Sequence, residues 1–295
     1  MGELAYKRPD RLEEALDFLA RYGKDTEVVA GATDVMVDLR AGDLDHKKYL
    51  LDISRLEALQ GIEFKDGKLV IGACATLTDI NQSGLVREHA PALAQCSEFF
   101  AARQIRNRAT IGGNIAHASP CGDTIPPLVV HEALAVVASA DGERTIPVDR
   151  IAAGPYQSGL LPDTLILRFI LKPSFAGFNA FQKIGRRREL AVSRMSLAVL
   201  LDRDSQGRVS FIRVSLGACT PTPSRMDAVE DFLMGKVPDQ DLVWQAGRLL
   251  SEKMVEITGR RSSTVYKAPA AQGLFMRLLC PVFEPGTGAA SAQGE

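Results

Sequence analysis

The sequence lacks any run of about 18 consecutive apolar residues, the length that a helix needs to cross a bilayer. Residues 1–8 also lack the apolar core of a signal peptide. A glycine follows the first methionine, but Tyr6 stands where a myristoylation motif requires Ser or Thr. These absences predict a cytoplasmic protein with no membrane span.

Paired cysteines are missing too. The five cysteines are far apart and form no C-x-x-C pair, and the four histidines do not cluster with them. This argues against a disulfide framework and against a zinc or iron–sulfur site, so we expect no metal on this chain. The formal net charge of -1 gives no electrostatic case for binding nucleic acid or an anionic membrane surface.

What the sequence does contain is the composition of an ordinary globular protein, with 46% hydrophobic and 24% charged residues. Its 295 residues suggest two domains. Residues 1–175 mix short strands with helices, whereas residues 176–282 place strands before helices, an α+β pattern. The small, polar residues of 283–295 predict a disordered tail.

Hydrophobic spacing and turn residues predict the individual elements. A helix over residues 12–22 is expected to start from a capping box formed by Asp10 and Glu13. Further helices are expected over residues 78–85, capped by Thr78, and over 91–99. Strands are predicted over residues 27–30, 48–53, 62–64, 69–71, 134–138, 164–171, 178–184, 196–202 and 209–216, and later helices over 225–235, 239–257 and 268–279.

The first loop of chemical interest is residues 30–33, Ala-Gly-Ala-Thr, between a buried strand and a helix. Backbone N–H groups at such a helix start can bind a pyrophosphate. Gly31 allows close backbone approach, Ala32 keeps the wall small, and Thr33 and Asp34 can cap the helix. The same residues also suit an ordinary strand–turn–helix corner, and this loop alone does not decide between the two.

The second loop is residues 110–114, Thr-Ile-Gly-Gly-Asn. Two adjacent glycines allow successive N–H groups to face a ligand with no Cβ atoms in the way. Thr110 and Asn114 can bond phosphate or ribose oxygens, and Asp123 can accept bonds from ribose hydroxyls. The alternative is a tight loop between buried strands, with Asp123 as a helix cap.

Neither loop matches G-x-G-x-x-G or the P-loop signature, and neither motif occurs elsewhere in the sequence. The residues of the two loops therefore predict a cofactor that bears phosphate groups, but they do not identify it.

Taken together, these motifs resemble those of the FAD-binding medium subunit of molybdenum hydroxylases, the xanthine dehydrogenase and carbon monoxide dehydrogenase family. Residues 28–34 are similar to its A-G-G-T-D loop, and residues 110–115 with 118–123 to its T-I-G-G-N-I…A-S-P…D signature. Residues 6–9, 181–187 and 217–225 also match family patterns, and the resemblance covers about residues 3–280.

The resemblance implies an FAD-binding domain of the vanillyl-alcohol-oxidase (PCMH) type, made of two subdomains, over residues 1–175. A smaller domain over 176–282, like that of the carbon monoxide dehydrogenase flavoprotein, would follow. It also implies the residues that contact FAD, namely Val29, Ala30, Gly31, Ala32, Thr33, Asp34, Val35, Phe100, Thr110, Gly112, Gly113, Asn114, Asp123, Ile166 and Lys183. It assigns no acid, base or nucleophile.

The resemblance leaves two features of the site undecided. Ala32 stands where the family usually has a second glycine, which could shift the first loop. Lys183 would lie near the flavin ring, with Gln182 as an alternative one residue away. The basic run at residues 186–188 is either a solvated surface or a cationic group near the cofactor.

The function implied is electron transfer. Partner subunits would carry the molybdenum cofactor and two [2Fe–2S] clusters, as a dimer of heterotrimers, and FAD on this chain would pass electrons to NAD⁺ or another acceptor. The substrate of the complex and the acceptor do not follow from this chain. Two alternatives remain: a stand-alone flavin oxidase of the vanillyl-alcohol-oxidase type, and an assembly module that has lost its flavin.

Overall fold

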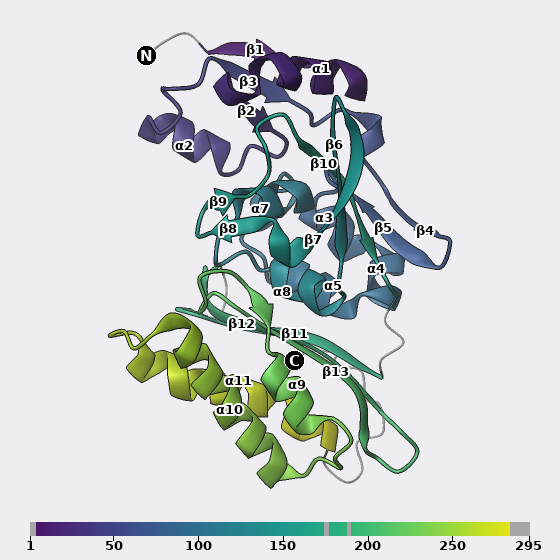
Figure 1. Ribbon diagram of the computed structural model, residues 1–295, viewed down its shortest axis with the longest axis vertical. Coiled ribbons are helices and arrows are strands. Elements are labelled where there is room, and N and C mark those ends of the chain that lie inside the picture. Colours follow the sequence, from purple (N-terminus) through teal and green to yellow (C-terminus); the bar gives the residue numbers. More distant parts are fainter. Residues whose placement is uncertain (1–3, 174–176, 188–189, 284–295) are drawn as a thin grey trace.

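The structure is a computed structural model that describes residues 4–173, 177–187 and 190–283. Within these residues the chain stacks three layers along its long axis, each built on one sheet (Figure 1). Strands and helices alternate in the first layer, a run of helices separates two groups of strands in the second, and strands precede helices in the third. This arrangement confirms the predicted α+β class.

The first layer is a parallel sheet in the order β1-β3-β2. Parallel neighbours need a crossover, and helices α1 and α2 provide the two crossovers. The carboxyl end of β2 therefore runs directly into α2, which places residues 30–34 at the edge of this layer. The elements are β1 (Ala5–Lys7), α1 (Leu12–Tyr22), β2 (Thr26–Val29), α2 (Val35–Ala41) and β3 (Tyr49–Asp52).

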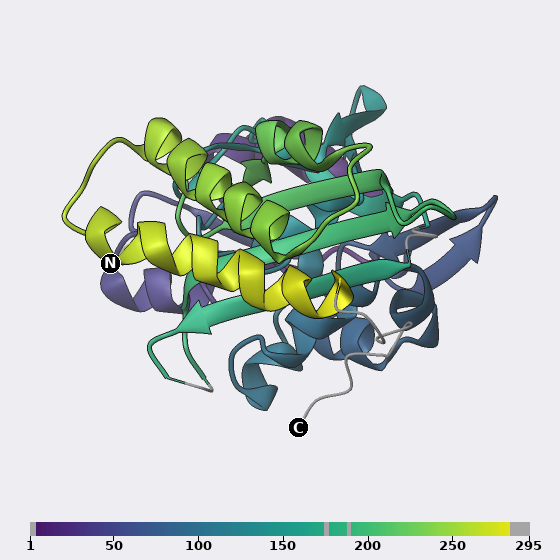
Figure 2. The same cartoon turned by 90° about the horizontal axis from the view of Figure 1, so that it is seen from below.

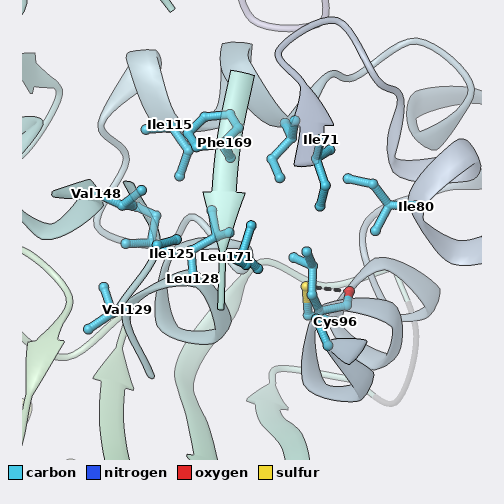
Figure 3. Packing of buried hydrophobic residues seen from close by; sticks show 14 of the residues in the cluster. Ile71, Ile80, Cys96, Ile115, Ile125, Leu128, Val129, Val148, Phe169 and Leu171 are labelled. Carbon is cyan, nitrogen blue, oxygen red and sulfur yellow. Dashed lines mark hydrogen bonds between the residues drawn. The ribbon is translucent and has the colours of Figure 1, made fainter. Parts of the chain in front are cut away.

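The second layer is an antiparallel sheet in the order β4-β5-β10-β6-β7, with short helices packed around it. Phe169 and Leu171 of its central strand point into a core that also contains Ile71, Ile115 and Leu128 (Figure 3). The strands are β4 (Ile62–Lys65), β5 (Lys68–Gly72), β6 (Leu134–Ser139), β7 (Gly142–Pro147), β8 (Ala152–Gly154), β9 (Gln157–Ser158) and β10 (Leu165–Leu171). The helices are α3 (Leu77–Gln82), α4 (Gly84–His89), α5 (Pro91–Glu98), α6 (Arg103–Arg106), α7 (Ile111–His117) and α8 (Ile125–Val130).

The third layer is an antiparallel sheet in the order β11-β12-β13-β14 with three helices on its outer face (Figure 2). Helices α5 and α8 of the second layer pack on its inner face. The strands are β11 (Phe178–Gly185), β12 (Ser193–Arg203), β13 (Val209–Gly217) and β14 (Ser224–Arg225), and the helices are α9 (Asp227–Leu233), α10 (Gln240–Thr258) and α11 (Thr264–Phe283).

Strand β12 is buried on both faces. Leu197 and Val199 pack into the core beneath α9–α11, whereas the intervening Ala198 and Leu200 pack into the core of the second layer. Successive side chains of a strand alternate between faces, so a strand covered on both sides reads as a continuous apolar run. That explains the unbroken apolar stretch that follows Ser196, and it makes the sheet a wall shared by two cores.

Hydrogen bonds also join the second and third layers. The side-chain amide of Asn179 donates to Nε2 of His131 over 3.2 Å, and its oxygen accepts from the N–H of Ala92 over 3.0 Å. Nδ1 of His131 lies 3.3 Å from the carbonyl oxygen of Lys172, which can only accept. His131 is therefore the neutral tautomer with its proton on Nδ1.

Two predicted caps are wrong. Helix α1 has Arg11 rather than Asp10 at its N-cap, with no side-chain cap, and the N–H of Asp10 donates to the Glu14 carboxylate over 3.3 Å. The predicted helix over residues 78–85 divides into α3 and α4. It is Thr76 that caps α3, in a reciprocal capping box with Asp79.

No helix in the described ranges is long and apolar enough to cross a membrane. Phe283 is the last residue of α11, and the rest of the predicted disordered tail lies outside the described residues.

Candidate functional site

The two loops singled out in the sequence lie against each other. A Cβ atom added to Gly31 would lie only 2.0 Å from the carbonyl oxygen of Arg108 and 3.0 Å from Cα of Ala109. Such distances leave no room for any side chain, so Gly31 is needed to bring the backbone of the first loop onto the segment leading into Thr110. The close approach that Gly31 permits is to the protein's own backbone.

The two glycines of the second loop have different surroundings. A Cβ on Gly112 would lie 2.7 Å from the carbonyl oxygen of Ala73, so this glycine packs against β5's end. A Cβ on Gly113 would meet only the hydroxyl oxygen of Thr110, at 2.9 Å. Gly113 is therefore the glycine of the pair that leaves its surface free for a ligand.

Backbone hydrogen bonds distinguish the loops further. In the second loop, Ile111 and Gly112 donate to carbonyl oxygens of residues 75 and 73, and Gly113 donates to the Thr110 hydroxyl over 3.1 Å. These residues form the first turn of α7 rather than an open loop. In the first loop, the four consecutive N–H groups of residues 31–34 have no acceptor among the described residues. The first loop thus offers the unused donors.

Ala32 has a left-handed backbone conformation, with φ of 64°. For a residue with a Cβ this conformation costs about 1–2 kcal/mol. The turn at this position therefore favours glycine, and Ala32 occupies it under strain.

Both loops line one cavity of about 350 Å³, a volume in the range of small-molecule sites. Phe100 and the strand segment ending at Ile166 form other parts of its wall. Twelve of the fifteen predicted contact residues line it, namely Ala30, Gly31, Ala32, Thr33, Asp34, Val35, Phe100, Thr110, Gly112, Gly113, Asn114 and Ile166. Val29, Asp123 and Lys183 are outside this lining.

Asp123 and Lys183 contact each other instead. The Lys183 ammonium lies 2.8 Å from the Asp123 carboxylate, and Ser193 donates to the same carboxylate over 2.6 Å. The Asp123 side chain is only 6% exposed. Burial raises the pKa of this carboxyl, while Lys183 and the Ser193 hydroxyl lower it. The network joins β11 and β12 to the turn before α8.

Gln182, the alternative to Lys183, points elsewhere. Its side-chain oxygen accepts a hydrogen bond from Arg277 of α11 over 3.0 Å. Adjacent strand residues face opposite sides of a sheet, so Lys183 faces the second layer and Gln182 the outer helices. Of the basic run, Arg186 and Arg187 line a second cavity of about 550 Å³ beside Ser193, and residue 188 lies outside the described residues.

Five titratable residues of the cavity wall were not predicted, namely Glu27, Asp38, Lys47, Cys74 and His117. Nε2 of His117 lies 3.9 Å from Asp34, and its ring makes an edge contact with Tyr156. The sequence did contain a signal for Glu27, because it is an acidic residue in a strand that was predicted to be buried. Lys47 carried no local signal, because it reaches the cavity only through the fold.

Comparison with known proteins identifies the class. Residues 2–173 match the family described as the FAD binding domain in molybdopterin dehydrogenase, and residues 179–282 match the CO dehydrogenase flavoprotein C-terminal domain. The chain belongs to this family of FAD-binding subunits, as its motifs predicted. It is an FAD-binding component of a dehydrogenase, and therefore part of an oxidoreductase.

Individual relatives span almost the whole chain. The carbon monoxide dehydrogenase medium chain of Hydrogenophaga pseudoflava is 31% identical over 93% of this chain and 95% of its own length. A putative xanthine dehydrogenase FAD-binding subunit of Escherichia coli is 30% identical over 88% of this chain and 87% of its own. The solved structure of carbon monoxide dehydrogenase from Hydrogenophaga pseudoflava matches with a TM-score of 0.87, at 29% identity over 94% of this chain and 96% of that one.

Proposed function

We propose that this chain is the electron-transfer subunit of a molybdenum hydroxylase complex, with FAD held in the cavity between the two loops. The observation that carries the proposal is the row of four N–H groups at residues 31–34 with no protein acceptor among the described residues, beside the open surface of Gly113. Successive unpaired N–H groups form a concavity for an anion. The donor set therefore fits a pyrophosphate.

The roles proposed for the individual residues follow from this placement. The N–H groups of residues 31–34 would bind the pyrophosphate, with Thr110 holding the first turn of α7 in place through its bond to Gly113. Phe100 and Ile166 would supply apolar contact at the cavity wall. Val29, at the end of β2, would support the first loop from behind. Asp123 and Lys183 would lie near the flavin ring as a paired charge rather than as separate contacts.

When bound, FAD supplies the ability to accept electrons and pass them on, and the protein's part is to bind and orient it. The proposed partners are a large subunit with the molybdenum cofactor and a small subunit with [2Fe–2S] clusters, arranged as a dimer of heterotrimers. FAD would pass the electrons on to NAD⁺ or to another acceptor. The relatives support the partners, because one is named as a medium chain of carbon monoxide dehydrogenase.

The first experiment measures flavin content. Purified chain should be yellow and should release FAD on denaturation. Gly113→Val places a branched side chain on the open surface and should abolish FAD binding. Gly84→Val is the matched control, because a Cβ at Gly84 meets nothing within 4 Å. A wild-type chain that cannot be loaded with FAD, or a Gly113→Val variant with full FAD content, would sink the proposal.

The second experiment tests electron transfer. A tagged chain should co-purify with subunits that contain molybdenum and iron, and the substrate of that complex should bleach the flavin only when those subunits are present. Substrate-dependent bleaching of the isolated chain would instead support a stand-alone oxidase.

A further inference from the structure

Glu27 is an acidic residue placed on the cavity wall with its hydrogen-bonding capacity unused. It lies on β2, and its side chain is 31% exposed. Within the described residues no N–H or O–H group donates a hydrogen bond to its carboxylate, and the nearest cation, Nζ of Lys47, is 4.0 Å away. A half-buried carboxylate without donors is costly unless something else supplies them.

Lys47 is itself held firmly in place. Its ammonium donates to the carbonyl oxygen of Lys24 over 3.2 Å and to that of Thr26 over 3.1 Å. Two of its three N–H groups are therefore committed to the backbone on either side of β2's start. Lys47 balances part of the charge of Glu27 and keeps it beside the cavity, but it leaves the acceptor positions of the carboxylate open.

The other carboxylate that sequence reasoning offered for a sugar contact is already engaged. Asp123 accepts from Lys183 and Ser193 and lies outside the cavity lining. Asp34, on the wall, accepts from the Thr33 hydroxyl and lies near His117. Asp38 also lines the wall, one turn into α2. Glu27 differs from these aspartates because it lies on a strand of the first layer, β2, which leads into the first loop.

We propose that Glu27 accepts hydrogen bonds from a sugar hydroxyl of the dinucleotide and so selects a ligand with that hydroxyl. This inference rests on the proposed FAD site. A carboxylate repels the pyrophosphate that the neighbouring loop would bind, so the ligand group that Glu27 meets must be a donor. Carboxylates recognise ribose hydroxyls in this way at other dinucleotide sites. The hydroxyl belongs either to the adenosine ribose or to the ribityl chain.

The test is titration of the flavin-free full-length chain with FAD, followed by flavin fluorescence. Glu27→Leu should weaken FAD binding at least about tenfold, because a site built for a hydroxyl loses its acceptor. Glu27→Gln, whose amide oxygen still accepts, should lose less. Glu63→Leu on β4 is the matched control and should bind as wild type, since Glu63 is exposed and outside the cavity lining.

Two ligands distinguish the sources of the hydroxyl. FMN lacks the adenosine half, so FMN binding that still depends on Glu27 assigns the ribityl chain. The ribose is assigned if two results are found together. FMN binds wild type and Glu27→Leu with equal affinity, and removing the 2′-hydroxyl of the adenosine in FAD weakens binding to wild type but not to Glu27→Leu. Equal FAD affinity, within twofold, for wild type and Glu27→Leu overturns the inference.

Folding is checked by circular dichroism and thermal melting of each variant. Should Glu27→Leu not fold, Glu27→Gln decides, and unchanged affinity together with unchanged discrimination between the analogues overturns the inference. A wild-type chain that binds no FAD at all overturns the proposed function instead, so the two failures are distinguishable.

Discussion

The ammonium of Lys183 lies 2.8 Å from the carboxylate of Asp123, in the contact between the third layer and the second. Both side chains are largely buried, at 12% and 6% exposed. Removing one partner of such a pair leaves a buried charge without compensation, at a cost of about 3–5 kcal/mol.

Lys183→Met should therefore lower the free energy of unfolding by about 3 kcal/mol or more, measured by urea denaturation. The double variant Asp123→Asn, Lys183→Met should recover much of this loss, because no buried charge remains unpaired. A single variant within about 1 kcal/mol of wild type would show that the pair contributes as little as a surface ion pair.

Gly31→Ala should disrupt the site by separating the two loops. Its Cβ would lie 2.0 Å from the carbonyl oxygen of Arg108, and backbone cannot move aside as a flexible side chain can. We expect a loss of about 2–3 kcal/mol in unfolding free energy, and a larger loss in FAD content. Gly273→Ala on α11 is the control and should stabilise by about 0.5–1 kcal/mol. Normal FAD content in Gly31→Ala would contradict the contact.

Ala32→Gly should relieve the strain of the first loop. The left-handed conformation of Ala32 costs about 1–2 kcal/mol, and the greater freedom of glycine in the unfolded chain offsets about 0.4–1 kcal/mol of the relief. A net gain of about 0.5 kcal/mol is expected in thermal or urea denaturation. Ala32→Val, which is β-branched, should lose more than about 1 kcal/mol. The opposite order of the two variants would exclude strain at this position.

His131 should make stability depend on pH. Burial lowers the pKa of its imidazole to about 4. The unfolded chain takes up this proton near pH 6.5, so the contribution is fully present above about pH 6.5 and is lost as pH falls toward 4. At pH 5 this residue alone should cost about 2 kcal/mol relative to pH 8.

The measurement compares wild type with His131→Gln across this range of pH in urea. The variant is expected to be less stable at pH 8, because it loses the bond to Asn179 or to Lys172. Its stability should fall less steeply between pH 6.5 and 5. Parallel curves for the two proteins would mean that another group dominates this range.

Local pattern was enough to predict most of the elements. The turn at residues 65–68 connects β4 and β5, and Pro91 opens α5 as expected. The central strand of the third layer was predicted from a continuous apolar run, which is what a strand covered on both faces produces, and the turn at residues 204–208 separated it from the next strand. Caps were predicted less well, since Arg11 and Thr76 hold positions that neighbouring polar residues could equally have held.

The two loops of the site were predicted from the sequence, but the contact between them was not. Gly31 resembles a residue that admits a ligand, yet what it touches is Arg108, far along the chain. No pattern within a single loop contains that partner. The same limit applies to Glu27 and Lys47, which meet only because β2 and the segment before β3 are neighbours. Strand alternation separates Lys183 from Gln182 but does not say which faces the second layer.

The sheet of the third layer, which is buried on both faces, limits how the two halves of this protein can be separated or exchanged in evolution. A fragment that ended near residue 173 would expose the apolar sides of α5 and α8, and the remaining fragment would expose the inner face of β11–β13. Either surface is of the kind that aggregates or is recognised by cellular quality control. The two halves must therefore be inherited as a matched pair, because a foreign third layer would place other side chains where Ala198 and Leu200 now pack into the core of the second layer.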